Sequence, residues 1–326
     1  MDHQGNSAPR AVPHERLKML NSETRPILVA GATGKQGGAV ARALLQAGRS
    51  VRGLVRDPAS AAAQALAAQG VEILQGDYHD SASLDAAMEE AWGAFSVQMG
   101  SHPADPDTEV VTGKAFLDAA KRAGVAMVVH TSVARAGDQH NFVGWDEGRW
   151  EPLYWNNKSA VNDMVKSQGF RNWTILKPAM IMEDLVPPTA DFQYPSLRER
   201  GQFETGIEAE SRIDWIAADD IGAFAAAAFA DPERFHGREI DLAAETLTMP
   251  DLAAKIAAGT GKSVSAVTVS KEEALKKPMG ELVYQRETWD NVEGYKVDLD
   301  AVRRWGLPLT TLDDFIAQNR DKFAIG

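Results

Sequence analysis

Tyr154 and Lys158 stand four residues apart in a stretch of helical periodicity that begins at Pro152. This spacing places both side chains on one face of a helix. The pKa of an unperturbed tyrosine is about 10, and a nearby positive charge lowers it toward the range useful for proton transfer at neutral pH. We therefore predict that Tyr154 protonates a substrate oxygen and that Lys158 lowers its pKa. The alternative is that Tyr154 only packs among aromatic neighbours while Lys158 binds a cofactor.

Ser132 is the third candidate for chemistry. It follows a predicted strand over 125–130 and precedes the Tyr154 helix, so its hydroxyl could donate a hydrogen bond to a carbonyl group undergoing reduction. Thr131 is a weaker substitute for this role. His130 is predicted to pack at the strand end rather than act as a base, and the histidines have no spacing typical of a metal site.

A glycine-rich loop near the start of the chain predicts where a hydride donor would bind. The uncharged run 27–30 is typical of a buried parallel strand, and Gly31, Gly34 and Gly37 follow it before a helical pattern begins. Gly31 permits a tight turn, Gly34 allows a pyrophosphate close to the backbone, and Gly37 lets the helix pack on the strand. The free N–H groups of the first helical turn then form an anion site.

The end of the second predicted strand, over 50–55, indicates which dinucleotide binds. An acidic residue at this position accepts from the ribose 2′-hydroxyl of NAD, whereas an arginine accommodates the 2′-phosphate of NADP. Arg56 comes first, and Asp57 is followed by Pro58, as in a turn or helix cap. This order favours NADP over NAD, with a solvated surface arginine as the alternative. Lys35 would add positive charge near the phosphates.

Strands and helices alternate through the first half of the chain, as in a doubly wound parallel sheet. Ligand contacts are expected where strands end, at Asp77 and Tyr78 after the third strand and in the loop 98–107 after the fourth. Further strands are predicted at 71–74, 94–97, 125–130 and 173–176, and further helices at 60–69, 81–90, 108–123 and 152–166. Residues 134–155 are rich in aromatic side chains and lack periodicity, which predicts either a flap over a substrate pocket or a small satellite core.

The pattern changes beyond residue 180. Prolines interrupt 186–197, and shorter elements follow: strands at 213–216, 238–242 and 264–269, and helices at 217–230, 250–258 and 312–320. We predict a disordered extension over 1–25, a dinucleotide-binding domain over 26–180, and a smaller α/β substrate lobe over 181–326. Segments at about 213–242 are expected to return to the first domain.

Composition narrows the range of functions. The chain has 326 residues, a net charge of −12, 44% hydrophobic residues and no cysteine. The acidic balance disfavours direct binding to nucleic acid or to an anionic membrane. Without cysteine there are no disulfides or thiolate nucleophiles, which suits a cytoplasmic location. No uncharged apolar stretch approaches the length needed to span a membrane.

Several motifs, taken in order, resemble the NmrA-like branch of atypical short-chain dehydrogenases/reductases. They are Gly31-Ala32-Thr33-Gly34-Lys35-Gln36-Gly37-Gly38, Val55-Arg56-Asp57-Pro58, Gly76-Asp77, His130-Thr131-Ser132, Trp155-Asn156-Asn157-Lys158 and Leu176-Lys177-Pro178-Ala179. The resemblance implies a Rossmann domain with a small substrate lobe and NADP(H) as cofactor. It further implies Arg56 on the 2′-phosphate, Asp77 near the adenine and Lys158 near the nicotinamide ribose.

The active-site tyrosine is often missing in this family, and Tyr154 has the right spacing here. The complete set of predicted cofactor contacts is Gly31, Thr33, Gly34, Lys35, Gln36, Gly37, Arg56, Asp77, Tyr78, Gln98, Thr131, Lys158 and Pro178. No metal site is predicted.

Three functions fit these features. The first is an NADPH-dependent reductase of a small carbonyl, quinone or similar unsaturated substrate. The second is a catalytically silent NADP(H)-binding redox sensor or regulator, and the third an NAD-dependent epimerase or dehydratase. The expected partner is a small-molecule substrate, and the chain could be a monomer or a homodimer.

Overall fold

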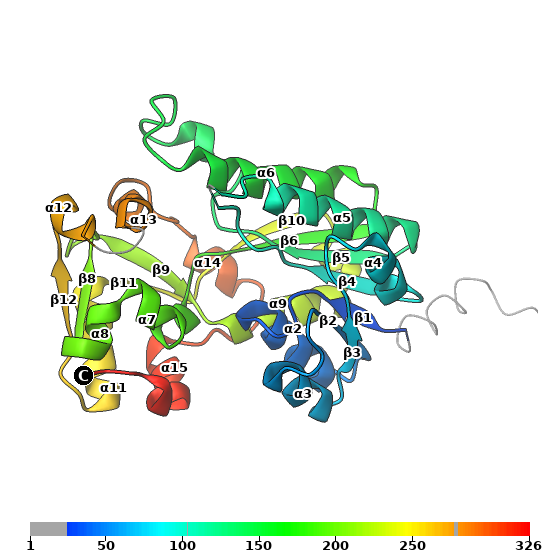
Figure 1. Cartoon of the computed structure of the whole chain (residues 1–326), viewed down its shortest axis with the longest axis horizontal. Coiled ribbons are helices and arrows are strands. Elements are labelled where there is room, and N and C mark those ends of the chain that lie inside the picture. The colour runs from blue at the N-terminus through cyan, green and yellow to red at the C-terminus, as the bar shows by residue number, and fades with distance from the viewer. Residues whose placement is uncertain (1–24, 103, 277–279) are drawn as a thin grey trace, which may run out of the picture.

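The computed structural model describes residues 25–102, 104–276 and 280–326 (Figure 1). Its main feature is a seven-stranded sheet in the order β10-β6-β5-β4-β1-β2-β3, in which every neighbouring pair is parallel. The strands are β1 (Ile27–Val29), β2 (Val51–Val55), β3 (Glu72–Gln75), β4 (Gly93–Ser96), β5 (Met127–Thr131), β6 (Asn172–Pro178) and β10 (Arg238–Leu242). The strand order reverses between β1 and β4, so a crevice for ligands opens at their carboxyl ends.

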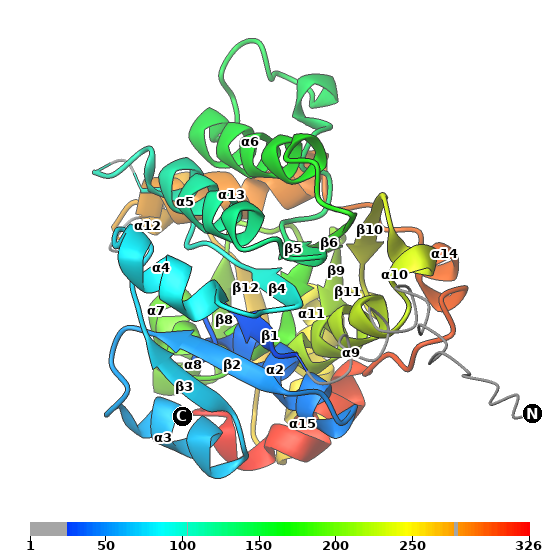
Figure 2. The same cartoon turned by 90° about the vertical axis from the view of Figure 1, so that its right-hand side faces the viewer.

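Helices cover both faces of this sheet (Figure 2). One face carries α2 (Lys35–Gln46), α3 (Ala61–Ala68) and α9 (Ala218–Ala230), and the other carries α4 (Ser81–Met88), α5 (Thr108–Arg122) and α6 (Pro152–Ser167). Each helical layer buries an apolar cluster against the sheet, because the central strands point hydrophobic side chains to both sides. The predicted Rossmann-type fold is therefore confirmed.

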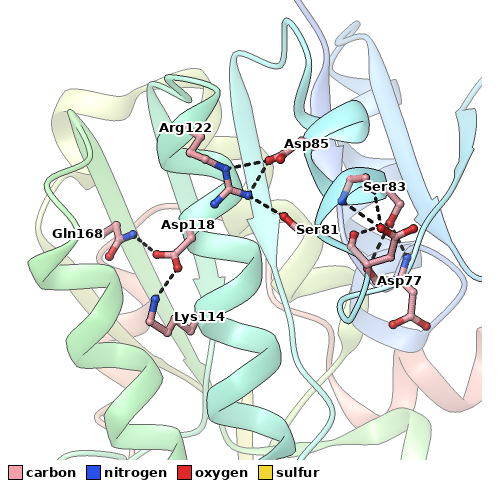
Figure 3. Close-up of polar contacts among 10 residues, drawn as sticks. Asp77, Ser81, Ser83, Asp85, Lys114, Asp118, Arg122 and Gln168 are labelled. Atoms are coloured by element: carbon pink, nitrogen blue, oxygen red, sulfur yellow. Dashed lines mark hydrogen bonds and ion pairs between the residues drawn. The ribbon is translucent and has the colours of Figure 1, made fainter.

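Polar contacts join the outer surfaces of α4, α5 and α6. Arg122 on α5 pairs with Asp85 on α4 at 2.6 Å, and Asp118 on α5 accepts hydrogen bonds from Lys114 and from Gln168 after α6 (Figure 3). These groups are largely exposed, so each contact contributes little stability and the apolar layer beneath supplies most of it.

A smaller lobe lies beside the carboxyl ends of the strands. It contains a three-stranded sheet of β11 (Glu245–Thr248), β9 (Arg212–Ile216) and β7 (Met180–Ile181), and a pair of β12 (Ser265–Thr268) and β8 (Gln202–Thr205). Its longer helices are α11 (Met249–Thr260), α13 (Gly280–Val292) and α15 (Leu312–Asn319). Shorter elements of the lobe are α7 (Thr189–Gln193), α8 (Pro195–Arg200), α12 (Lys271–Ala274) and the 3-10 turns η2 (Met182–Leu185) and η3 (Arg320–Lys322). Two other short helices, α10 (Pro232–Phe235) and α14 (Leu299–Arg303), contact β6 and β10 of the large sheet, and the 3-10 turn η1 (Gln139–Asn141) lies between β5 and α6.

The structure changes two expectations for the second half of the chain and adds a helix that was not expected. Strand β9 pairs with β11 and β7 in the smaller sheet, so within 213–242 it is α9, α10 and β10 that return to the large one. The stretch 186–197, which prolines were expected to interrupt, includes α7 and the first three residues of α8. Helix α13 was not predicted at all. The extension over 1–25 lies outside the described residues apart from Arg25, and the division into domains remains a prediction.

A carboxylate ties the two parts together at the start of α9. Both oxygens of Glu183 in η2 accept the backbone N–H of Ala218, at 3.1 and 2.9 Å. Burial raises the pKa of Glu183 to about 7, and the nearby Asp219 and Asp184 act in the same direction. The first apolar cluster also runs from the large sheet into the lobe without interruption.

Candidate active site

The glycine loop has the shape of a phosphate cradle. Gly31 has a φ of +57°, in the left-handed region that suits glycine, and a Cβ atom on Gly37 would lie 2.2 Å from the Gly31 carbonyl oxygen. Helix α2 begins at Lys35 with Gly34 as its N-cap, and no side chain caps its first turn. The backbone N–H groups there remain available to an anion, because the first turn of a helix has no acceptors of its own. The loop therefore fits a dinucleotide pyrophosphate.

Lys35 differs from its predicted role. Its ammonium group forms an ion pair with Asp184 in η2 and donates to the Thr189 hydroxyl at the start of α7. The lysine thus bridges the cradle and the smaller lobe instead of being reserved for phosphate. Sequence could not show this contact, because Lys35 and Asp184 lie far apart along the chain.

Arg56 follows β2 and is exposed. Among the described residues, no side-chain hydrogen bond or ion pair involves its guanidinium, which is therefore available to a phosphate. Asp57 accepts the N–H of Ala59 at 2.9 Å, and Ser60 caps α3, so the acidic residue has the turn role that sequence predicted. Both features are compatible with selection of NADP.

Asp77 and Tyr78 form a well-packed turn after β3. The Asp77 carboxylate accepts the N–H of His79 at 2.8 Å, and the Asp77 backbone exchanges hydrogen bonds with the Ser83 side chain (Figure 3). The Tyr78 hydroxyl donates to the carbonyl of Val97 at 2.5 Å. Burial, with a smaller effect of Asp77, raises the pKa of Tyr78 above its usual value. These contacts fix the conformation of the turn after β3. A role of Asp77 or Tyr78 at the adenine remains a prediction.

The end of β5 meets the start of α2. The Thr131 hydroxyl donates to the Gln36 side-chain carbonyl at 2.6 Å, which fixes both side chains. The neighbouring Ser132 hydroxyl is buried and has no partner among the described residues. An unpaired buried hydroxyl is costly unless a ligand bonds to it. The predicted hydrogen bond from Ser132 to a substrate stays a prediction, and no other described residue competes for this hydroxyl.

Lys158 sits in a buried polar cluster. Its ammonium group pairs with Glu109 of α5 at 2.6 Å, and both side chains are nearly buried. Gln98 donates to Ser96 at 3.0 Å, and His130 Nδ1 lies 3.2 Å from the Ser96 hydroxyl. Burial, with a smaller effect of Lys158, lowers the pKa of His130 to about 3, so His130 is neutral and packs at the strand end. The Glu109 partner was not foreseen.

Tyr154 also behaves differently from the expectation. Two cations lie close to its ring, with the Lys158 ammonium 5.7 Å and the Arg286 guanidinium 5.4 Å from the ring centroid. Both cations favour the phenolate, but burial outweighs them and the pKa of Tyr154 is raised. The predicted lowering is therefore wrong for this state of the protein, because spacing along a helix carries no information on desolvation. Tyr154 keeps its proton at neutral pH.

A cavity of about 420 Å³ joins several of these groups. Gln36, Ser132, Tyr154, Lys158 and Pro178 all line it, so the structure brings the three predicted catalytic side chains to one space. Arg56, Asp77 and Tyr78 do not line it and follow other strands. This separation agrees with an extended dinucleotide whose two ends are recognised by different loops.

Sequence reasoning missed the opposite wall of the cavity. Helix α13 and the residue Tyr295 contribute side chains there, and Arg286 on α13 pairs with Glu151 at 2.9 Å. The pattern around Arg286 and Trp289 is helical, but nothing local shows that it faces the Tyr154 helix.

The aromatic segment 134–155 forms the satellite core that was one of its two predicted alternatives, and part of it lines the cavity. Phe142, Trp150 and Trp155 form a small buried cluster with Trp289 of α13, and the Trp155 and Trp289 ring centroids are 4.9 Å apart. Trp150 and Trp155 also line the cavity. A satellite core therefore serves as the wall of the pocket.

The parallel sheet, its switch point and the glycine cradle define a Rossmann-type protein that binds a dinucleotide cofactor. The model of the NmrA-like family matches residues 23–322. The chain belongs to the NmrA-like family, as its motifs predicted.

Two curated relatives are similar along most of their length. An NmrA-like family domain-containing oxidoreductase, notA, from Aspergillus sp. (strain MF297-2) is 30% identical over 78% of this chain and 79% of its own. An NAD(P)H azoreductase from Xenophilus azovorans is 30% identical over 78% of this chain and 80% of its own.

Solved structures share the fold. An NADPH-dependent quinone oxidoreductase from Escherichia coli superposes with a TM-score of 0.68 at 24% identity, covering 90% of this chain and 98% of that one. NmrA, a negative transcriptional regulator solved with NADP, superposes with a TM-score of 0.72 at 22% identity, covering 92% and 96%. At these identities the likeness shows the fold alone.

Proposed function

We propose that this protein is an NADPH-dependent oxidoreductase that reduces a small unsaturated substrate, such as a carbonyl compound or quinone, in the cavity beside the glycine cradle. One observation carries the proposal: Ser132, Tyr154 and Lys158 line a single cavity of about 420 Å³, a size suited to a small molecule. The azoreductase and quinone reductase among the similar proteins support the same reaction class.

The cradle and the groups around it hold the cofactor. Backbone N–H groups at the start of α2 would bind the pyrophosphate, and Arg56 would bind the 2′-phosphate. Gln36, Gln98, Thr131, Lys158 and Pro178 would hold the nicotinamide end. NADPH bound in this way supplies a hydride.

The protein supplies the proton and the polarisation. The Ser132 hydroxyl donates a hydrogen bond to the substrate oxygen, which draws electron density from the carbon that accepts the hydride. Tyr154, protonated because burial raises its pKa, gives its proton to the resulting oxyanion. Lys158 then stabilises the phenolate, and solvent restores the proton.

Turnover tests this proposal. NADPH oxidation with menadione is measured for the wild type, Ser132→Ala and Tyr154→Phe, with NADPH affinity measured in parallel. We expect both variants to bind NADPH normally and to lose most of the activity. Wild-type protein that binds NADPH but oxidises it with no member of a broad carbonyl and quinone panel would rule the proposal out.

A regulatory function is the second candidate. It is favoured by the pairing of Lys158 with Glu109 and by the likeness in fold to NmrA. A regulator would bind NADP⁺ and NADPH with different affinities and show no turnover. Calorimetric titration with the two redox forms separates the candidates. A cytoplasmic location and the oligomeric state remain predictions.

A further inference from the structure

The positive charges around the cavity are matched by carboxylates. Arg286 pairs with Glu151, and Lys158 pairs with Glu109. Lys35 does not line the cavity, but it pairs with Asp184, which does. Each of these three cations therefore has a carboxylate partner that lies far from it in the sequence. An anionic substrate would find no unmatched positive charge among the described residues of the wall.

Asp290 is an acidic residue of the cavity wall for which the described residues provide no cation partner. It lies on α13, lines the cavity, and is only 8% exposed. Its Oδ1 atom is buried, and the described part of the chain offers it no hydrogen-bond partner. Burial, then Glu287 and Asp214, raise the pKa of Asp290 well above its usual range, and the phenols of Tyr194 and Tyr295 also lie near it. The raised pKa means that this carboxyl group holds its proton when no cation is near, and a cationic ligand beside it would favour the ionised form and give the buried oxygen a partner.

The rest of the wall is rich in aromatic rings. The cavity is lined by Trp150, Tyr154, Trp155, Phe192, Trp289 and Tyr295. Ring faces attract cations, and the Tyr154 ring already has a guanidinium and an ammonium group within 6 Å. The Trp289 indole N–H, next to Asp290 in sequence, is also buried without a partner in the described chain. A flat cationic ligand would therefore lie among aromatic side chains and next to Asp290.

We infer that the cavity selects a flat aromatic substrate that carries a cationic nitrogen, and that Asp290 is the residue that recognises this charge. The inference rests on the proposed function and names its substrate class. Asp290 would face the nitrogen while the aromatic rings hold the ring system.

Reduction of such a substrate is simpler than that of a carbonyl. The hydride of NADPH forms a bond to the carbon of an iminium group, the π pair of the C=N bond becomes the lone pair of nitrogen, and NADP⁺ is released. The cation becomes a neutral amine and the cofactor takes up the positive charge, so the step needs no proton from the protein. Tyr154 would then contribute its ring to binding and its proton only to oxygen-containing substrates.

The experiment compares two bicyclic probes, N-methyl-dihydroisoquinolinium, which is a cationic iminium, and neutral menadione. Binding is measured by quenching of tryptophan fluorescence, and turnover by NADPH oxidation, for the wild type and Asp290→Asn. Asp300→Asn removes the same charge from an exposed position on α14 and serves as the matched control. Thermal melting and NADPH affinity show whether each variant is folded.

We expect the wild type and Asp300→Asn to bind the iminium more tightly than menadione. Asp290→Asn should weaken iminium binding by about tenfold or more and leave menadione binding unchanged, since only the charge is lost. Equal effects on both probes, or none, in a folded variant would overturn the inference. Turnover of menadione without turnover of the iminium would overturn it while leaving the proposed function intact. Binding of the iminium through Asp290 without any NADPH oxidation would uphold the charge site and reject the reductase.

Discussion

Replacing Arg56 with alanine is expected to weaken NADPH binding selectively. The guanidinium is exposed and has no partner in the described chain, so its removal should leave stability unchanged. A hydrogen bond to a charged group contributes about 1.5 to 3 kcal/mol, and exposure to solvent places Arg56 toward the lower end of that range. Since each 1.4 kcal/mol is about tenfold in Kd, the loss should lie between about tenfold and a hundredfold.

Calorimetric titration with NADPH and NADH measures the effect. NADH lacks the 2′-phosphate, so its affinity should be the same in the wild type and Arg56→Ala, while Arg56→Lys should recover part of the NADPH affinity because it restores the charge without the planar fork. Arg171→Ala is the matched control, since Arg171 is also exposed but precedes β6, at the opposite end of the strands. Equal weakening of both coenzymes, or no change in either, would refute the assignment of Arg56.

Three further results are expected. Gly37→Ala should lower the melting temperature and abolish measurable NADPH binding in calorimetry, because its Cβ would lie 2.2 Å from the Gly31 carbonyl oxygen; normal binding would contradict the cradle. Tyr154→Phe should reduce kcat for menadione by about a hundredfold or more with unchanged Kd for NADPH, and unchanged kcat would remove the tyrosine as proton donor. The pKa of Glu183 is raised to about 7 by burial, so the folded state binds more protons than the unfolded state and stability falls as pH rises from about 4.5 to 7, by at most about 3 kcal/mol. Glu183→Gln should flatten this slope in urea unfolding, and an unaltered slope would place its origin elsewhere.

The nucleotide-binding half could be predicted because its signals are local. The uncharged run before Gly31 and the glycine spacing fix a strand, a turn and a helix start, and helical periodicity gives α5 and α6 nearly to the residue. The end of each parallel strand then marks a ligand contact. No information from distant parts of the chain is needed for these steps.

The smaller lobe could not be predicted in the same way. Strand β9 is short and buried, and nothing in its four or five residues indicates pairing with β11 rather than with the large sheet. The wall formed by α13 depends on contacts between residues far apart in sequence, such as Arg286 with Glu151. The direction of the Tyr154 pKa likewise depends on burial by those distant residues.

The chain leaves the large sheet after β6 and comes back to complete it only with α9 and β10. During synthesis on the ribosome, the edge of β6 therefore stays unpaired until β10 has emerged, which requires residues beyond 242. Helix α2 likewise stays uncovered until α9, which packs beside it, has been made. A fragment cut at residue 180 would keep the entire phosphate cradle yet expose a bare strand edge and an uncovered apolar face, both of which promote aggregation. Neither half can be expressed as an independent module by a single cut in the chain.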